Sequence, residues 1–346
     1  MVSRKGEFGM KTDRFGTKFD RLYVAVVTPM KENYAVDESA LRKLLQYFMQ
    51  PKFREAGGAI IINPEAGELF SLRREEKRRN VEIALEECGG KVPIFAGVID
   101  INTEDAVKVA VDAKKVGADG LFLMPPIGSQ DISTTWNAEK YPEVFVDMAK
   151  AEVEAVDLPA IVHPVGSPSP TFGIGLPLNA TLQMCQEIPN IVGWKMTYLY
   201  PGSFIIAKAL RKLDHHVGIL RSAARFFHEN LATDYFDGTV TGSFNYAMEP
   251  MIDHINAWRR RDIEGACRIW KSGLADLHEY VYGDYSRLHV RYKIAAWLRE
   301  LIPLPFMRPP MPKPRKEEVV TLRELLAKAG LTVIPERDSD RIAAQL

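Results

Sequence analysis

Short apolar runs recur along the chain from Tyr23 to Thr241, and each is continuous rather than alternating with polar residues. Continuous runs of this length are typical of strands buried on both faces, as in a parallel sheet. The expected strands are Tyr23–Val27, Ala59–Ile62, Pro93–Val98, Leu121–Met124, Ala160–His163, Ile191–Lys195, Val217–Leu220 and Thr239–Thr241.

Apolar residues at helical spacing lie between these runs. Asp37 and the pair Asn102/Thr103 stand where helices would start, and both offer side chains that commonly cap a helix. Asn179 is expected to cap a third helix in the same way. Two of the apolar stripes are Leu41, Leu44, Leu45 and Phe48, and Ala106, Val109, Ala110 and Ala113.

Strand and helix alternate about eight times, which predicts an α/β fold with a parallel sheet. The first strand is not followed by a glycine-rich dinucleotide fingerprint, so a closed (β/α)8 TIM barrel is favoured over an open sheet. After Met248 the pattern is purely helical, which predicts a C-terminal helical extension. Pro303–Pro314 is expected to be an ordered surface connection. We expect an N-terminal extension at 1–20, the barrel at 21–250, the helical extension at 251–335 and a tail at 336–346.

Composition narrows the class of protein. The 346 residues carry 45 basic and 45 acidic side chains, so no strong field favours nucleic acid or an anionic membrane. The three cysteines are odd in number and far apart, which indicates a reducing compartment. The first residues lack the apolar stretch of a signal peptide, and no apolar run is long enough to span a membrane. A cytoplasmic protein without metal or cofactor is therefore expected.

Three ionisable residues lie where barrel enzymes place their chemistry, at the carboxyl ends of strands. They are Glu65 after the second strand, His163 at the end of the fifth and Lys195 at the end of the sixth. Burial would lower the pKa of Lys195 and leave a neutral amine able to attack a carbonyl and form an imine. A rim lysine whose ammonium reaches water fits the position equally well.

Sequence motifs decide between these two interpretations of Lys195. They occur in one order and run from Val27-Thr28-Pro29 through Gly67-Glu68 to Pro189-Asn190-Ile191-Val192-Gly193-Trp194-Lys195. Together they resemble the dihydrodipicolinate synthase/N-acetylneuraminate lyase family over roughly residues 21–331. The resemblance implies a homo-oligomer, usually a tetramer built from dimers. It also implies that Lys195 forms an imine with pyruvate or another 2-oxo acid. The intervening motifs are Leu72 with Glu75-Glu76-Lys77-Arg78, Val92–Gly97 and Gly117-Ala118-Asp119-Gly120.

The chain departs from the family pattern at residues that handle protons. Glu65 and Ala66 stand where the family has two threonines, and His163 replaces the tyrosine of a Tyr-Asn pair. Ile127 replaces a second tyrosine, which in the family reaches a neighbouring subunit's site. The segment Gly166–Gly175, taken as a loop, lacks the arginine of many synthases. Authentic dihydrodipicolinate synthase activity is therefore not expected.

The two replacements Glu65 and His163 are chemically complementary. A carboxylate beside an imidazole can fix its tautomer and raise its pKa, which would give an acid–base pair effective near neutral pH. The alternative is that Glu65 pairs with Arg73 while His163 is a hydrogen-bonded residue of the rim. We favour the catalytic pair, because both substitutions fall on relay positions of the family.

Other candidates would hold the substrate. Backbone donors at Ala66 and Gly67 are expected to bind a carboxylate. Thr241 and Ser243 end the last strand and would contact the same carboxylate. An equally good interpretation is that their side chains form capping or loop hydrogen bonds and do not bind substrate. Glu68 is expected to form a structural ion pair. Arg221 and Ser222 are further candidates for binding an oxyanion. The pair His215-His216 has no third metal ligand placed near it in the sequence. The remaining helical histidines are expected to be surface or core residues, namely His228, His254, His278 and His289.

The sequence thus predicts a class I lyase that forms a Schiff base between Lys195 and a 2-oxo acid. The imine would accept electrons during carbon–carbon cleavage, the reverse condensation or a dehydration. The alternative is a catalytically silent or regulatory barrel that binds a 2-oxo acid but has lost turnover together with the tyrosine relay.

Overall fold

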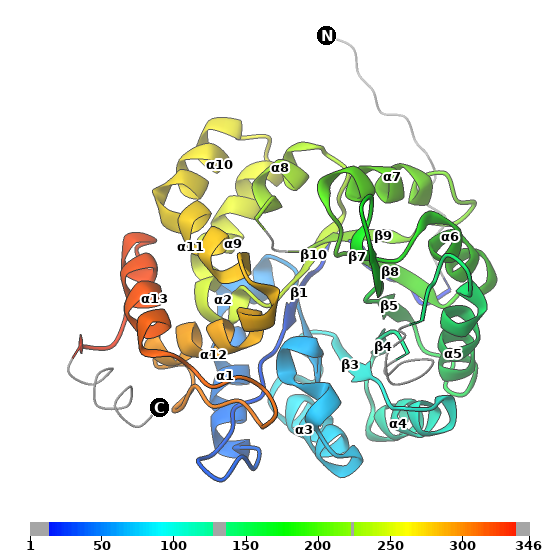
Figure 1. The fold of residues 1–346 in the computed structure, drawn as a ribbon, viewed down its shortest axis with the longest axis horizontal. Coiled ribbons are helices and arrows are strands. Elements are labelled where there is room, and N and C mark those ends of the chain that lie inside the picture. Colours follow the sequence, from blue (N-terminus) through cyan, green and yellow to red (C-terminus); the bar gives the residue numbers. More distant parts are fainter. Residues whose placement is uncertain (1–13, 127–135, 223–224, 337–346) are drawn as a thin grey trace.

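The computed structural model describes residues 14–126, 136–222 and 225–336. Eight parallel strands close into a barrel in the order β1-β10-β9-β8-β5-β4-β3-β2 (Figure 1). This confirms the predicted TIM barrel. The barrel strands are β1 (Leu22–Ala25), β2 (Gly58–Ile62), β3 (Ile94–Val98), β4 (Gly120–Leu123), β5 (Ala160–Val162), β8 (Ile191–Met196), β9 (Gly218–Arg221) and β10 (Gly238–Thr241).

Helices surround the barrel, and the C-terminal ones gather on one side of it (Figure 1). Helix α9 crosses residue 250, so the last barrel helix extends into the C-terminal helical region; it is kinked at Ala247, and a short turn separates it from α10. The helices are α1 (Glu38–Phe48), α2 (Pro51–Glu55), α3 (Arg74–Cys88), α4 (Thr103–Val116), α5 (Pro142–Glu154), α6 (Leu178–Glu187), α7 (Tyr200–Leu210), α8 (Phe227–Ala232), α9 (Phe244–Arg259), α10 (Ile263–Ile269), α11 (Ala275–Tyr282), α12 (Leu288–Leu298) and α13 (Lys316–Lys328).

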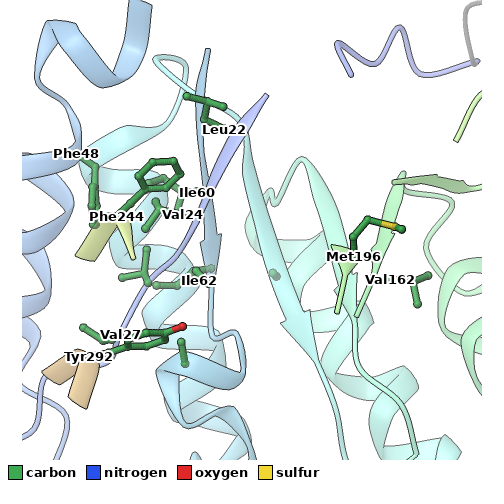
Figure 2. Close-up of a cluster of buried hydrophobic side chains, with 14 of the residues drawn as sticks. Leu22, Val24, Val27, Phe48, Ile60, Ile62, Val162, Met196, Phe244 and Tyr292 are labelled. Atoms are coloured by element: carbon green, nitrogen blue, oxygen red, sulfur yellow. The ribbon is translucent and has the colours of Figure 1, made fainter. Parts of the chain in front are cut away.

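The strands are apolar throughout because both of their faces are buried. Side chains of a strand point alternately to opposite faces. On β2, Ile60 and Ile62 therefore join the core between barrel and helices, while Ala59 and Ile61 join a second core inside the barrel. Figure 2 shows part of the outer core, which includes Phe48 of α1 and Phe244 of α9. The ring of Phe53 on α2 packs against both, with ring centres 5.6 and 5.9 Å apart. This division explains the continuous rather than alternating runs in the sequence.

Two of the predicted helix starts are confirmed and one is wrong. Asp37 caps α1 and Asn102 caps α4, each accepting a hydrogen bond from a backbone N–H three residues on. Asn179 does not cap α6, because Pro177 holds that position and the Asn179 side chain donates to the carbonyl of Glu139 at 3.1 Å.

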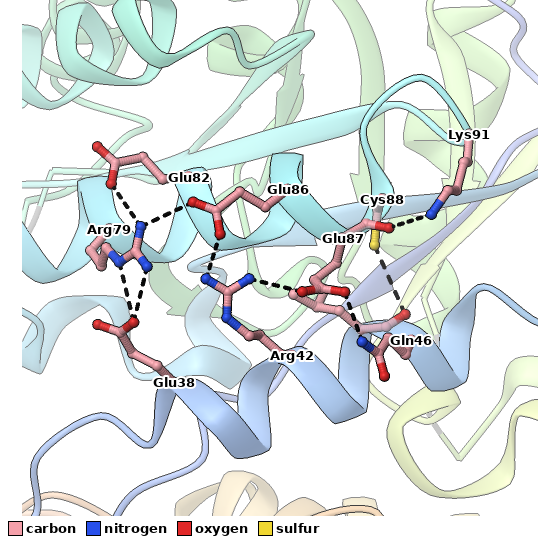
Figure 3. Close-up of polar contacts among 10 residues, drawn as sticks. Glu38, Arg42, Gln46, Arg79, Glu82, Glu86, Glu87, Cys88 and Lys91 are labelled. Carbon is pink, nitrogen blue, oxygen red and sulfur yellow. Dashed lines mark hydrogen bonds and ion pairs between the residues drawn. The ribbon is translucent and has the colours of Figure 1, made fainter.

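Ion pairs join α1 to α3 across their exposed sides (Figure 3). Arg42 contacts Glu86 and Glu87, and Arg79 contacts Glu38 and Glu86. Each pair of this kind contributes only about 0.2–1 kcal/mol, because water and salt screen it. The packing of α1 and α3 therefore depends mainly on their buried apolar faces.

Two segments differ from their sequence-based description. The region taken as a loop contains a hairpin of β6 (Val165–Ser169) and β7 (Gly173–Gly175), which lacks a continuous apolar run because its residues are only partly buried. The helix expected over 263–282 is broken between α10 and α11, where Gly273 has a φ of 126°. A Cβ at Gly273 would lie 2.7 Å from the backbone of Ala329, so glycine allows α13 to end against this break.

A buried ion pair ties the C-terminal helices to the barrel. Glu68 follows β2 and accepts a hydrogen bond from Lys293 of α12, and both side chains are fully buried. This confirms the structural ion pair expected for Glu68. The backbone N–H of Arg308 also donates to Glu68 at 2.8 Å, and its guanidinium pairs with Glu76. The connection Pro303–Pro314 is thus held against the barrel, as expected.

Among the described residues, the longest and most apolar helices still fall short of what a membrane crossing requires.

Candidate active site

Lys195 lies within β8 at the mouth of the barrel, one residue before the strand ends. Its Nζ is 3.0 Å from Nε2 of His163, which directly follows β5. Phe122 of β4 forms an apolar floor below both groups: its ring centre is 5.9 Å from Nζ of Lys195 and 5.7 Å from the His163 ring. The fold therefore brings a lysine and an imidazole together in a nonpolar setting.

Burial lowers the pKa of Lys195 from 10.5 to about 8, although the charge of Glu65 partly opposes this shift. With such a pKa, roughly one tenth of the amine is neutral at pH 7. A neutral amine is the form that attacks a carbonyl carbon. Lys195 can therefore act as a nucleophile near neutral pH, whereas an exposed lysine would be almost fully protonated.

Glu65 completes a row of three side chains. Its Oε2 lies 3.5 Å from Nδ1 of His163, whose side chain is 1% exposed, and Glu65 itself is 37% exposed. A carboxylate at Nδ1 favours the tautomer with hydrogen on that nitrogen, which leaves Nε2 as an acceptor toward Lys195. The alternative ion pair between Glu65 and Arg73 is not among those that the described residues form.

The pKa of His163 differs from the sequence-based expectation. Burial and, to a smaller extent, the charge of Lys195 lower it from 6.5 to about 3, because Glu65 raises it too little to compensate. Burial alone would raise the pKa of Glu65, but the neighbouring His163, His289 and Lys195 bring it below 4.5. The expected rise of the imidazole pKa toward neutrality is therefore wrong, because desolvation outweighs the carboxylate. In the resting site His163 is a neutral acceptor.

A tight turn presents Glu65 and Ala66 to the site. Residues Glu65–Gly67 form a 3-10 turn after β2, and the Thr28 hydroxyl donates to the carbonyl of Gly67 at 2.7 Å. A Cβ at Gly67 would lie 2.7 Å from the carbonyl oxygen of Val26, so only glycine fits here. The Gly67 N–H donates to Pro64 within the turn at 2.9 Å. Ala66, by contrast, lines the small cavity that contains Lys195.

These groups surround a cavity of about 140 Å³. This is close to the roughly 150 Å³ that holds one benzene ring, so the cavity suits a small molecule. Further residues from β1, the β6–β7 hairpin and the C-terminal helices line the cavity together with Lys195, His163, Glu65 and Ala66. Its further residues include Ala25, Pro64, Ile174, Met196, Thr197, Tyr198, Ser222, Asn230, Gly242, Tyr282, Tyr285, Leu288, His289 and Tyr292.

Some sequence-based candidates lie apart from this cavity. Thr241 and Ser243 are buried behind its wall, where the Thr241 hydroxyl accepts from the Ser243 N–H at 3.0 Å. Arg221 is buried at the end of β9 and donates to Ser203, whereas the adjacent Ser222 does line the cavity. Ile127 lies outside the described residues.

Sequence reasoning missed the contribution of the C-terminal segment. Tyr282, Tyr285, His289 and Tyr292 all line the cavity that contains Lys195. They were expected to be core or surface residues of helices, because helical spacing shows that a face is buried and does not show against what. The carboxyl end of a strand marks a barrel site in the sequence, and no comparable signal marks a helix that covers it.

The described residues contain no group of three or more His, Cys, Asp or Glu side chains that could hold a metal ion. A larger groove of about 520 Å³ lies along the proline-rich connection. Glu32 and Lys313 are the charged groups among its described lining residues, and none of the site candidates reaches it.

Fold and site together define an α/β barrel with a buried, strand-borne lysine beside an imidazole at its mouth. Residues 18–329 match the model of the Dihydrodipicolinate synthetase family. The chain belongs to this family, as the sequence motifs indicated.

Relatives and solved structures agree with this assignment. The chain is 26% identical over 324 residues to a 4-hydroxy-tetrahydrodipicolinate synthase of Methanopyrus kandleri, which covers 93% of this chain and 99% of the relative. It also superimposes on the dihydrodipicolinate synthase of Aquifex aeolicus with a TM-score of 0.76 at 23% identity, covering 91% and 100% of the two chains. A catalytic lysine mutant of the sialic acid aldolase of Ruminococcus gnavus gives a TM-score of 0.74 at 16% identity over 94% and 98%. These two structural matches support the fold.

Proposed function

We propose that the protein is a class I lyase that forms a Schiff base between Lys195 and a 2-oxo acid such as pyruvate. The observation that carries this proposal is the 3.0 Å contact between Nζ of Lys195 and Nε2 of His163 in a small cavity at the barrel mouth. Membership of a family that includes aldolase-type lyases supports the same class of reaction.

The first chemical step is imine formation. The neutral amine of Lys195, held by its hydrogen bond to Nε2 of His163, attacks the carbonyl carbon of the 2-oxo acid, and a proton passes from its nitrogen to the carbonyl oxygen. The carbinolamine then loses water to give the imine. Glu65 positions His163 for this role, since a carboxylate near Nδ1 keeps Nε2 free to accept.

The imine then serves as an electron sink. Electrons from a breaking bond beside the imine carbon move onto nitrogen and give an enamine, which supports aldol cleavage, its reverse or loss of water. His163 returns a proton to the enamine carbon. Of the two carboxylate donors expected from the sequence, Ala66 remains the proposed holder of the substrate carboxylate, whereas the Gly67 N–H is bound within the turn. Thr241 and Ser243 support the cavity wall from behind.

The substrate differs from that of the synthases. Glu65, Ala66 and His163 stand at relay positions of the family, so the acid–base equipment is not that of an authentic dihydrodipicolinate synthase. Glu65 repels a second anionic group placed beside it, which favours a neutral, cationic or polyhydroxylated distal part. A cavity of about 140 Å³ limits that part to a few atoms beyond the 2-oxo acid.

We further propose that the enzyme acts in the cytoplasm as a homo-oligomer, without metal or cofactor. All three cysteines are free, which fits a reducing compartment. The resemblance to the family supports a tetramer or a dimer. No contact with nucleic acid or membrane is proposed, because the formal net charge is +0.

A product screen tests the proposed function. The purified protein is incubated with 2-keto-3-deoxy sugar acids, and in the reverse direction with pyruvate and small aldehydes, and the products are identified by mass spectrometry. Turnover that disappears in Lys195→Ala and Lys195→Arg is expected, because guanidinium stays protonated and cannot form an imine. A wild type that forms the adduct but turns over no member of the panel would instead be a silent 2-oxo-acid-binding barrel.

A further inference from the structure

A chain of buried hydroxyl groups runs from the cavity into the C-terminal helices. The Tyr292 hydroxyl of α12 donates to the Tyr282 hydroxyl of α11 at 2.6 Å, and Tyr282 is 3.1 Å from the hydroxyl of Ser243. Ser243 in turn is 3.1 Å from Nε2 of His278. Tyr282 and Tyr292 line the cavity of Lys195, whereas Ser243 and His278 are fully buried behind it.

The direction of every hydrogen bond in this chain is determined by its inner end. Nδ1 of His278 lies 2.8 Å from the carbonyl of Leu274, which can only accept, so the hydrogen is on Nδ1 and Nε2 is the acceptor. Ser243 must therefore donate to Nε2. Its oxygen then accepts from Tyr282, whose oxygen already accepts from Tyr292. All hydroxyl hydrogens of the chain thus point away from the cavity.

The outer end of the chain is consequently an acceptor. Tyr292 directs its own hydrogen inward, so toward the cavity its phenolic oxygen offers lone pairs. Gly242 at the end of β10 allows this placement, because a Cβ there would lie 2.3 Å from the Tyr292 ring. Figure 2 labels Tyr292 in the buried cluster that also contains Val27 (Figure 2). The ring is therefore fixed by packing rather than free to turn.

We propose that Tyr292, Tyr282, Ser243 and His278 form a proton relay for a hydroxyl group of the substrate, which would be a 4-hydroxy-2-oxo acid. This inference rests on the proposed Schiff-base function. The relay provides hydroxyl groups for proton transfer, which the protein lacks at Glu65, Ala66 and His163. Tyr292 is the catalytic residue that contacts the substrate hydroxyl, and the other three are positioning residues.

In the proposed cleavage, one proton moves along the relay while one carbon–carbon bond of the substrate breaks. The bond between the third and fourth carbons of the imine breaks, and its electrons form the enamine. The hydroxyl proton on the fourth carbon passes to Tyr292 as the carbonyl of the aldehyde forms, and one proton shifts along each link until Nε2 of His278 is protonated. When the aldehyde leaves, a water molecule enters the cavity, and the relay returns its proton from Tyr292 through this water to His163. His163 passes this proton to the enamine carbon, and water then hydrolyses the imine to release the 2-oxo acid and Lys195.

Burial of these groups favours concerted transfer. It raises the pKa of Tyr282 to about 12 and also raises the pKa of Tyr292 well above 10, so neither exists as a phenolate near neutral pH. Burial lowers the pKa of His278 to about 4, although its bond to Leu274 opposes this, so the imidazolium returns its proton readily.

The test separates the relay from the proposed function by three readouts. Trapping of pyruvate with borohydride reports imine formation at Lys195, and deuterium exchange at the methyl group of pyruvate reports the enamine step. Release of pyruvate from a series of 2-keto-3-deoxy sugar acids reports cleavage. Tyr292→Phe and Tyr282→Phe should each slow cleavage by about 10²–10⁴-fold, the range for general acid–base catalysis, and leave trapping and exchange intact.

Tyr246→Phe is the matched control. Tyr246 also donates to Ser243 at 3.1 Å and is fully buried, but it lies on a side branch that does not line the cavity. Its removal should leave cleavage close to the wild-type rate. The double variant of Tyr282 and Tyr292 should be little slower than the poorer single variant, because residues that act as a unit are not additive.

Solvent isotope effects distinguish a relay from a packing role. The cleavage rate of the wild type should depend on the deuterium content of water with the curvature of several moving protons, and Tyr282→Phe should make this dependence linear. Cleavage by Tyr292→Phe at the wild-type rate would overturn the relay alone. A wild type that traps pyruvate but cleaves none of the series would overturn the relay together with the lyase function and leave a barrel that only binds a 2-oxo acid. Absence of trapping in the wild type would overturn the Schiff-base function. An NMR spectrum that shows His278 with hydrogen on Nε2 would refute the donor order without any substrate.

Discussion

Burial at the end of a strand changes the chemistry of Lys195. Because its pKa is lowered from 10.5 to about 8, the neutral amine becomes the main form above pH 8 rather than above pH 10.5. The initial rate of pyruvate trapping with cyanoborohydride should therefore rise with pH, with its inflection near pH 8, and level off above it. In Glu65→Gln the inflection should move to lower pH, since the carboxylate raises the Lys195 pKa. An inflection near 10 would show that the ammonium is not desolvated.

Glu65 and His163 are expected to act as one unit. Their 3.5 Å separation fits a carboxylate that sets the imidazole tautomer, and the low pKa of His163 fits a neutral ring that accepts a hydrogen bond from Lys195. Glu65→Gln and His163→Asn should each slow turnover and methyl deuterium exchange of pyruvate by roughly 10²–10⁴-fold. The double variant should be little worse, while Ile174→Val, in the same cavity wall, should have little effect. Losses that multiply would mean that the two residues act independently.

Elements differ in how well the sequence predicts them. The barrel strands were predictable because burial on both faces leaves a continuous apolar run, as in Gly58–Ile62. The β6–β7 hairpin was not, because Val165–Ser169 is partly exposed and contains a proline. In the site, Lys195, His163, Glu65 and Ala66 were predictable as strand-end residues. Covering residues such as Tyr292 were not, because their role depends on how a C-terminal helix docks on the barrel.

The docking of these helices should depend on the buried pair of Glu68 and Lys293. Glu68→Gln leaves the Lys293 ammonium buried without its countercharge, which should lower the free energy of unfolding by about 3–5 kcal/mol. Adding Lys293→Met should recover part of this loss, because no buried charge then remains. The exposed pair of Asp234 and Arg261 is the control, and Asp234→Asn should cost about 0–1 kcal/mol. Chemical denaturation measures all of these values, and equal losses in both pairs would contradict the account.

At the scale of the whole molecule, apolar side chains are exposed at α7, on the outer ring of helices (Figure 1). Tyr200 and Phe204 of α7 are 50% and 36% exposed, and the adjacent Leu199 is 44% exposed. Burying such residues in a contact between copies is favourable, so we expect a dimer or tetramer in solution. Tyr200→Glu should lower the mass measured by light scattering during gel filtration. Val320→Glu on α13, where Val320 is 45% exposed, should leave the mass unchanged. A monomeric wild type would contradict this prediction.

The most direct test of the central claim is to locate the adduct after reduction with borohydride in the presence of pyruvate. The account predicts one pyruvyl group per chain, found by peptide mass spectrometry on Lys195, and no adduct in Lys195→Ala. Lys293 provides an internal comparison, because it is fully buried and paired with Glu68 and should remain unmodified. An adduct on another lysine, or equal labelling of Lys195→Ala and the wild type, would contradict the assignment of Lys195 as the nucleophile.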